Sequence, residues 1–287
     1  MLYEFKYADL LDDDVFKLVF GRESTKDVMI EFLNQVIPDR KITDLEFIDK
    51  EMHPVERDAK GSVYDMFCKT DDGSRIIVEV QRRKQPFYPE RALYYSTFQI
   101  QRQVEAGAET YDFLPVYVVN ILDFCMVGDL DDGKVKTVYR LYEENSHVLL
   151  TDRVTFIFIE LPKFKKSINE LDGNVLEGVY FCFKNMAALE ERPKVLSHQI
   201  FTKIFEVSEI YNMDKYTLKQ QRNNYFDTLK NDIILKSFPK NHYKYFDQFG
   251  LGKKIFIANI LGEFCDIFHA SSEKSVVFNL LCINVDF

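Results

Sequence analysis

The stretch VYDMFCKTDDGSRIIVEVQRR, residues 63–83, decides the fold. Two runs rich in β-branched and aromatic residues surround a short polar loop, and this pattern predicts an antiparallel hairpin. Gly73 tolerates a positive φ, and a three-residue loop that ends in glycine is a common hairpin connection. The loop Asp71–Gly73 then places Asp65 directly opposite Glu79. A two-residue loop would instead shift the register by one residue and put the two carboxylates on opposite faces.

The alternation of side chains divides the predicted hairpin into an apolar face and a face that carries carboxylates. The apolar face consists of Tyr64, Met66, Cys68, Ile76, Val78 and Val80. The second face consists of Val63, Asp65, Phe67, Ile77, Glu79 and Gln81. Opposed residues on one face bring their Cβ atoms within roughly 5 Å, so two carboxylates there repel unless a cation lies between them.

Two interpretations of the paired carboxylates are open. Oxygen ligands without a nearby His or Cys suit Mg²⁺, Mn²⁺ or Ca²⁺, which favours a metal site. The alternative is that both groups are simply solvated, or that Arg82 and Arg83 neutralise them, because structural ion pairs also produce such clusters.

The composition is that of a soluble globular protein. The chain has 287 residues and a formal net charge of −9, which argues against a protein that coats nucleic acid through its overall charge. A local basic groove is compatible with this charge, because binding responds to the field near the site. Five cysteines without a C-x-x-C pair indicate reduced thiols, and the sequence has no signal-peptide core and no apolar run of membrane-spanning length. We therefore expect a cytoplasmic protein.

Helical and strand patterns alternate through the first part of the chain. Apolar residues at helical spacing predict helices over 14–20 and 25–37, and Ser24 with Asp27 forms a capping-box pattern at the start of the second. Period-two alternation predicts further strands over 41–52, 114–122 and 153–161.

The rest of the chain is predicted to be mostly helical. A helix closed by Gly107 is expected between the hairpin and the next strand. From about Lys165 onward helical patterns dominate, so we place a domain boundary there. The sequence past about Asn224 has little clean periodicity and yields no fold prediction.

The order of these elements resembles the core of the PD-(D/E)xK nucleases. Several phrases resemble one branch of them, the PD-(D/E)xK nuclease family transposases, also called recombination-promoting nucleases. The matching phrases are DDDVFKLVFG (12–21), IEFLNQVI (30–37), DGSRIIVEVQ (72–81), FYPERALYYSTFQIQRQ (87–103), YDFLPVYVVNIL (111–122) and ELPKF (160–164). Together they cover roughly residues 10–165, and their order and spacing make the match more specific than any one phrase.

The resemblance implies a fold, an activity and a set of site residues. The fold would be α/β, with a mixed central sheet flanked by helices over 1–165 and a mainly helical region over 166–287. The activity would be divalent-metal-dependent hydrolysis of DNA by an endonuclease of transposition or recombination, using Mg²⁺ or Mn²⁺. DNA would be the partner, no membrane would be involved, and a homodimer is one option for the assembly. Asp65, Glu79 and the Val80 carbonyl would hold the metal.

The residue at position 81 departs from the superfamily pattern. Gln81 stands where lysine is usual in the superfamily, although this branch commonly has Glu-x-Gln. Gln offers neutral hydrogen bonds and no cation to polarise the attacking water. A cation from elsewhere could replace the lysine, with Lys69, Arg82 and Arg91 as candidates. The rival hypotheses are a catalytically degenerate nuclease fold that binds DNA or a partner, and an interaction protein in which the carboxylates only pair with arginines.

Basic residues concentrate directly after the hairpin. The segment 81–103 contains Arg82, Arg83, Lys84, Arg91 and Arg102. These residues are candidate phosphate contacts, with Gln99 and Gln103 reaching sugar or base edges. The alternative is an ordinary solvated face. Asp13 or Asp14 is a candidate auxiliary carboxylate for the metal, or else both are acids that favour the start of a helix.

Overall fold

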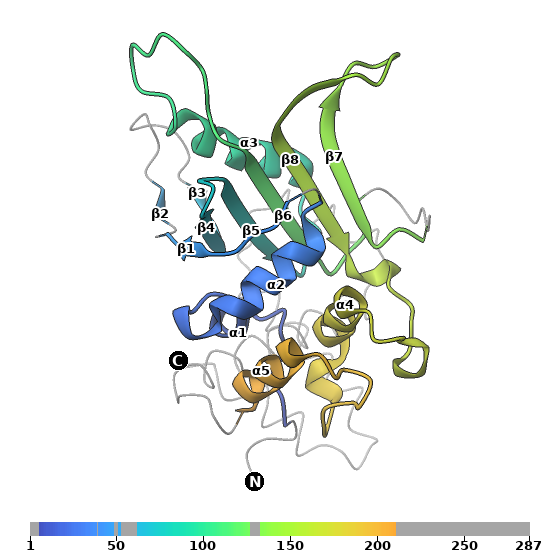
Figure 1. The fold of residues 1–287 in the computed structure, drawn as a ribbon. Coiled ribbons are helices and arrows are strands. Elements are labelled where there is room, and N and C mark those ends of the chain that lie inside the picture. Colours follow the sequence, from blue (N-terminus) through green and yellow to red (C-terminus); the bar gives the residue numbers. More distant parts are fainter. Residues whose placement is uncertain (1–5, 39, 49–50, 53–61, 127–132, 211–287) are drawn as a thin grey trace, which may run out of the picture. The chain divides into compact units, whose positions relative to one another are not determined.

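The computed structural model describes residues 6–38, 40–48, 51–52, 62–126 and 133–210, and the side chains of these residues except 51–52 and 62–63. A six-stranded sheet forms its centre, in the order β1-β4-β5-β6-β8-β7 (Figure 1). The strands are β1 Leu45–Phe47, β4 Met66–Thr70, β5 Arg75–Gln81, β6 Val116–Leu122, β7 Lys136–Tyr142 and β8 Leu149–Glu160. A separate antiparallel pair is formed by β2 Glu51–Met52 and β3 Ser62–Val63.

Helices cover both faces of this sheet. They are α1 Asp13–Phe20, α2 Lys26–Val36, α3 Tyr88–Gln101, α4 Val175–Asn185 and α5 Gln199–Ser208. Short 3₁₀ helices are η1 Glu23–Thr25, η2 Leu161–Lys163, η3 Ile168–Glu170 and η4 Met186–Ala188. Strands β5, β6 and β8 are parallel, and β1, β4 and β7 pair antiparallel to their neighbours. The sheet is therefore mixed and the fold is α/β, as expected.

Strand β5 separates two hydrophobic clusters, as the alternation of its side chains predicts. Ile76, Val78 and Val80 face the larger cluster, to which α1, α2, α4 and α5 contribute. Ile77 faces the smaller cluster, which lies under α3. The larger cluster is rich in phenylalanine, and Phe20 stacks on a ring of α4 with the centroids 5.6 Å apart.

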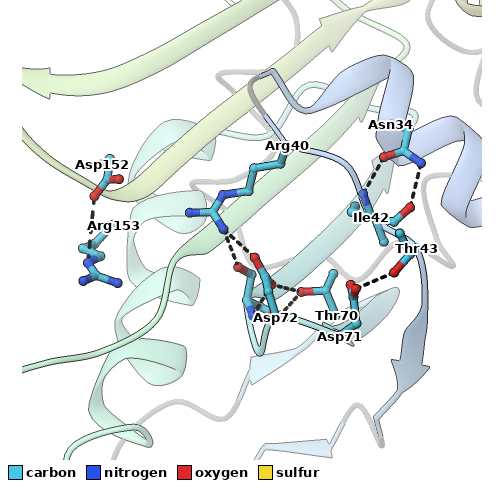
Figure 2. A network of polar contacts seen from close by, with 10 residues as sticks. Asn34, Arg40, Ile42, Thr43, Thr70, Asp71, Asp72, Asp152 and Arg153 are labelled. Carbon is cyan, nitrogen blue, oxygen red and sulfur yellow. Dashed lines mark hydrogen bonds and ion pairs between the residues drawn. The ribbon is translucent and has the colours of Figure 1, made fainter.

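The turn of the hairpin has the predicted register. Gly73 has a φ of +81°, and the pairs of β4 and β5 run from Met66↔Val78 to Lys69↔Arg75. Asp72 folds over the turn and accepts hydrogen bonds from the Thr70 hydroxyl and the Ser74 amide (Figure 2). Although partial burial acts the other way, these bonds lower the pKa of Asp72 to about 2.

The first strand of the predicted hairpin, expected from Val63 onward, is interrupted. β3 ends at Val63 and β4 begins at Met66, with a bend at Asp65 between them. Tyr64 therefore does not share a face with Met66, and that part of the prediction is wrong. Its ring packs under α3, where its hydroxyl donates to the Tyr95 carbonyl at 3.2 Å.

Three other boundaries differ from the sequence predictions. Helix α3 ends at Gln101, well before Gly107. The capping box at Ser24 does not form, because η1 precedes α2 and the cap residue Thr25 makes no side-chain cap bond. The strand expected over 41–52 is divided into β1 and β2, and β7 was not predicted.

The region that follows the sheet is helical as far as it is described. Helices α4 and α5 pack against α1 and α2 and belong to the same compact unit as the sheet. A functional division between 1–165 and 166–287 stays a prediction. The sequence past Asn224 lies outside the described residues.

Candidate active site

Two carboxylates meet at the end of the hairpin farthest from its turn. Glu79 is on β5, and its side chain is only 3% exposed under α3. Asp65 lies at the bend before β4, directly before the first pair of the β4–β5 register, Met66↔Val78. The Asp65 amide donates to Glu79 Oε1 at 3.3 Å, and the Val80 amide donates to Asp65 Oδ2 at 2.7 Å. The bend thus turns the Asp65 side chain toward the backbone of β5.

A guanidinium from α3 neutralises part of this charge. Arg91 Nη2 lies 3.0 Å from Glu79 Oε2. Its other nitrogens donate to Gln85 Oε1 at 2.7 Å and to the Tyr95 hydroxyl at 2.8 Å. The guanidinium carbon lies 5.0 Å from the centroid of the Tyr95 ring. Arg91 is therefore held in place by a carboxylate, an amide and a phenol.

The carboxylates of the site repel one another, and this raises the pKa of two of them. Burial, and then repulsion from Asp65, raises the pKa of Glu79 to about 8, although Arg91 acts against this. Partial desolvation, and then the charge of Asp65, raises the pKa of Asp13 at the start of α1. Asp13 therefore lies close enough to Asp65 to interact with it. Placing an additional cation here would relieve the repulsion among the three acids.

The donor set has the chemistry of a hard-cation site, but it is sparse. Within the described ranges, no three His, Cys, Asp or Glu side chains are grouped so that they could hold a metal ion by themselves. Asp65 and Glu79 nevertheless fit Mg²⁺ or Mn²⁺, because Mg²⁺ commonly takes one or two carboxylates while waters and substrate phosphates complete its shell.

Gln81 ends β5 on the same face as Glu79. Its carbonyl accepts from the Asp123 amide at 3.0 Å, where β6 ends beside β5. The carboxyl ends of parallel strands are where open α/β sheets bind ligands. Sequence reasoning missed a buried acid at this edge: Glu160 ends β8, accepts from the Met126 amide at 2.7 Å and pairs with Lys163 at 2.9 Å. The phrase ELPKF contained both residues of that pair.

The predicted nucleic-acid contacts are divided by the fold. Arg82 forms an ion pair with Asp9, and Arg91 with Glu79. Arg83 and Lys84 are exposed directly after β5. Arg102 is exposed at the far end of α3, three helical turns from Arg91.

A row of polar residues, which we call the α3 polar row, follows the inward side of α3 and the turn after it: Arg91, Tyr95 and Gln99 on the helix and Gln103 directly beyond its end. Gln99 is fully buried and accepts from the Arg75 guanidinium at 3.1 Å. Gln103 exchanges hydrogen bonds with the Leu114 backbone at 3.1 and 2.9 Å. The prediction that Gln99 reaches a sugar or base is therefore wrong, and Gln103 is engaged with the protein.

Lys69 does not approach the carboxylates. It is exposed on β4. Its backbone lies opposite that of Arg75 next to the hairpin turn, at the end of the strand away from Asp65. Among the cations proposed to replace the superfamily lysine, Arg91 is the one in contact with Glu79.

Comparison with known proteins identifies one family. The family described as PD-(D/E)XK nuclease family transposase matches residues 10–233. No curated protein and no solved structure matches the chain. In the described part of the chain, no helix combines the length and the apolar character that crossing a membrane requires.

Proposed function

Since this chain belongs to the PD-(D/E)XK nuclease family transposases, we propose that it is a divalent-metal-dependent DNA endonuclease of transposition or recombination. The observation that carries the proposal is the buried Glu79 carboxylate beside Asp65 at the carboxyl end of β5. Two acids in such a place are costly to keep charged in the absence of a cation. A divalent ion removes that cost and is the cofactor that nucleases of this superfamily generally use.

Asp65, Glu79 and the Val80 carbonyl are the proposed metal ligands. In a pleated strand the N–H and C=O of one residue point toward the same neighbouring strand. The Val80 amide donates to Asp65, so the Val80 carbonyl is directed to the same side of β5 as Asp65. Bound Mg²⁺ or Mn²⁺ would supply charge stabilisation for the phosphoryl group and a water of lowered pKa.

Gln81 is proposed to orient the attacking water. It follows Glu79 by two residues and lies on the same face of β5, at the edge of the site. A neutral amide can hold a water by hydrogen bonds but cannot deprotonate it. The hypothesis therefore assigns Gln81 a contribution to the rate and makes the metal responsible for the nucleophile.

DNA is the proposed partner. Arg83 and Lys84 are exposed directly after β5, and neither forms an ion pair with another described residue, so both can contact phosphates. Arg82 and Arg91 would first have to release Asp9 and Glu79.

The proposed location is the cytoplasm, which the free thiols of Cys68, Cys125 and Cys182 support. A homodimer stays one option for the assembly.

One observation favours the alternative of a degenerate nuclease that binds DNA without cutting it. Arg91 already supplies Glu79 with a positive partner. If that ion pair is permanent, the carboxylate is not available to a metal, and the fold would act as a binding module.

Plasmid cleavage separates the two functions. Supercoiled plasmid is incubated with the protein and Mg²⁺, Mn²⁺, Ca²⁺ or EDTA, and nicked and linear products are quantified. We expect cleavage with Mg²⁺ or Mn²⁺, its loss in Asp65→Asn and Glu79→Gln, and a reduced rate in Gln81→Ala. The matched control is Asp152→Asn, an exposed acid of β8. A double variant, Asp65→Asn with Glu79→Gln, that cuts at the parent rate would refute the proposed site.

A further inference from the structure

We propose that Arg91 leaves Glu79 when the metal binds and then holds a phosphate of the DNA, so that the two ligands strengthen each other's binding. This inference rests on the proposed function, because it concerns how that site loads. It assigns Arg91 a role in binding the substrate phosphate and gives the Arg91–Glu79 ion pair a purpose in the metal-free protein.

The contacts of Arg91 are asymmetric in charge. Glu79 is its anionic partner in the described part of the chain, whereas Gln85 and Tyr95 are neutral. A guanidinium has five N–H donors. These three residues engage three of the five, one each from Nη2, Nη1 and Nε, and the other two N–H groups have no partner among the described residues. The side chain is 31% exposed, so a ligand can approach it.

Metal and guanidinium compete for the same carboxylate. Glu79 Oε2 is already 3.0 Å from Arg91, and Glu79 Oε1 accepts from the Asp65 amide. A divalent ion ligated by Glu79 would bring a second positive group to that oxygen pair and repel the guanidinium. The metal therefore has to displace Arg91 from close contact with Glu79.

Displacement leaves a half-buried cation without its anion. Gln85 and Tyr95 can still hold the guanidinium near the site, since neither carries a charge for the metal to attract. A planar guanidinium matches two phosphate oxygens, and DNA supplies such an anion at the position where the metal needs further ligands. Metal binding thus prepares the phosphate contact, and by linkage DNA binding must strengthen metal binding by the same factor.

The first test is metal affinity in the absence of DNA. Ca²⁺ binding is measured by calorimetry at pH 9 and again at pH 10, and the affinities extrapolated to high pH are compared. This separates competition by the guanidinium from competition by protons, which Arg91→Gln strengthens because Arg91 lowers the pKa of Glu79. Removing the competing guanidinium in Arg91→Gln should tighten Ca²⁺ binding several-fold, and Arg91→Lys should lie between the two. The control Arg153→Gln also removes an arginine, but one in the first half of β8, away from the carboxyl end of the sheet where the site lies. This variant should leave Ca²⁺ affinity unchanged. Weaker Ca²⁺ binding by Arg91→Gln would overturn the exchange, because it would show that Arg91 only supports the carboxylate.

The second test is the coupling itself. Affinity for a short fluorescent duplex is measured by anisotropy with EDTA and with saturating Ca²⁺. The parent should bind more tightly with Ca²⁺, and Arg91→Gln should reduce this ratio by about ten-fold, which lies within the 5–150-fold typical of coupling between two sites. An unchanged ratio would overturn the inference. Thermal melting checks that each variant is folded. If Arg91→Gln does not fold, both measurements are made with Arg91→Lys instead.

Failure of this inference is distinguishable from failure of the proposed function. If the parent binds no divalent ion and cuts no DNA, the metal site is wrong. If the parent binds metal and cuts DNA while Arg91→Gln loses affinity for Ca²⁺, the proposed function stands and the exchange alone is refuted.

Discussion

Replacing Glu79 by glutamine should stabilise the metal-free protein, and the gain should depend on pH. Burial and Asp65 raise the pKa of Glu79 from 4.5 to about 8. Between these two values the folded state keeps a proton that the unfolded state has released. The native protein is therefore favoured by this group below about pH 4.5, and that contribution is lost as the pH rises through about 8. Glutamine keeps the shape of the protonated acid and cannot ionise.

The size of the effect follows from the shift. A change from 4.5 to about 8 is roughly 3.5 units, and at 1.36 kcal/mol per unit this gives a ceiling of about 5 kcal/mol above pH 8. Relaxation of the site around an ionised carboxylate lowers the real cost, so we expect about 2–3 kcal/mol. For a protein of this size each kcal/mol moves the melting temperature by about 2–4 °C. The variant should melt roughly 4–12 °C above the parent at pH 9 and close to it at pH 5.

Thermal denaturation followed by circular dichroism in EDTA at pH 5, 6.5, 8 and 9 measures this difference. Glu46→Gln is the matched control, because Glu46 is an exposed acid of β1 and should show no such trend. A difference in melting temperature between Glu79→Gln and the parent that stays constant from pH 5 to pH 9 would refute the reasoning, since a buried titrating acid must produce a slope.

Three further predictions concern the metal, the DNA and the turn. Mg²⁺ at 100 times its dissociation constant should raise the stability of the parent by about 2.7 kcal/mol and leave the melting of Asp65→Asn unchanged, in the same denaturation assay. Replacing both Arg83 and Lys84 by alanine should weaken binding to all DNA sequences and reduce the slope of log affinity against log salt by about 2, measured by anisotropy; an unchanged slope would place the contact surface elsewhere. Gly73→Ala should destabilise the protein by more than 1 kcal/mol in urea denaturation, because φ is +81° and a Cβ would lie 2.5 Å from Leu114 Cδ1; wild-type stability would contradict the assigned turn.

The register of the hairpin could be predicted because its determinants are local. Gly73 requires a particular turn, and the turn fixes which residues of β4 and β5 oppose each other. Asp65 and Glu79 could thus be paired from fifteen residues of sequence. The bend at Asp65 could not, because it depends on the Val80 amide and on the attraction of the Tyr64 hydroxyl to α3.

Contacts between distant elements account for most of the other differences. Arg91 belongs to a basic segment, and its sequence neighbours do not reveal that the chain folds it back onto Glu79. A polar residue such as Gln99 is expected at the surface, yet Gln99 is buried because the Arg75 guanidinium donates a hydrogen bond to its side-chain oxygen. Strand β7 lies at an edge of the sheet, and its mixture of charged and apolar residues, several of them exposed, lacks the alternation of a half-buried strand.

The α3 polar row determines which part of the site can move. Its members recur every four residues, and each is bonded to a different part of the sheet or its connections, from Glu79 at one end to Leu114 at the other. Sliding the helix by one residue would break these contacts together, so the backbone of α3 is held as a rigid rod. Any movement of Arg91 must then be a rotation about its side-chain bonds and not a shift of the helix. The proposed exchange of partners at Glu79 would therefore leave the backbone of the site in place.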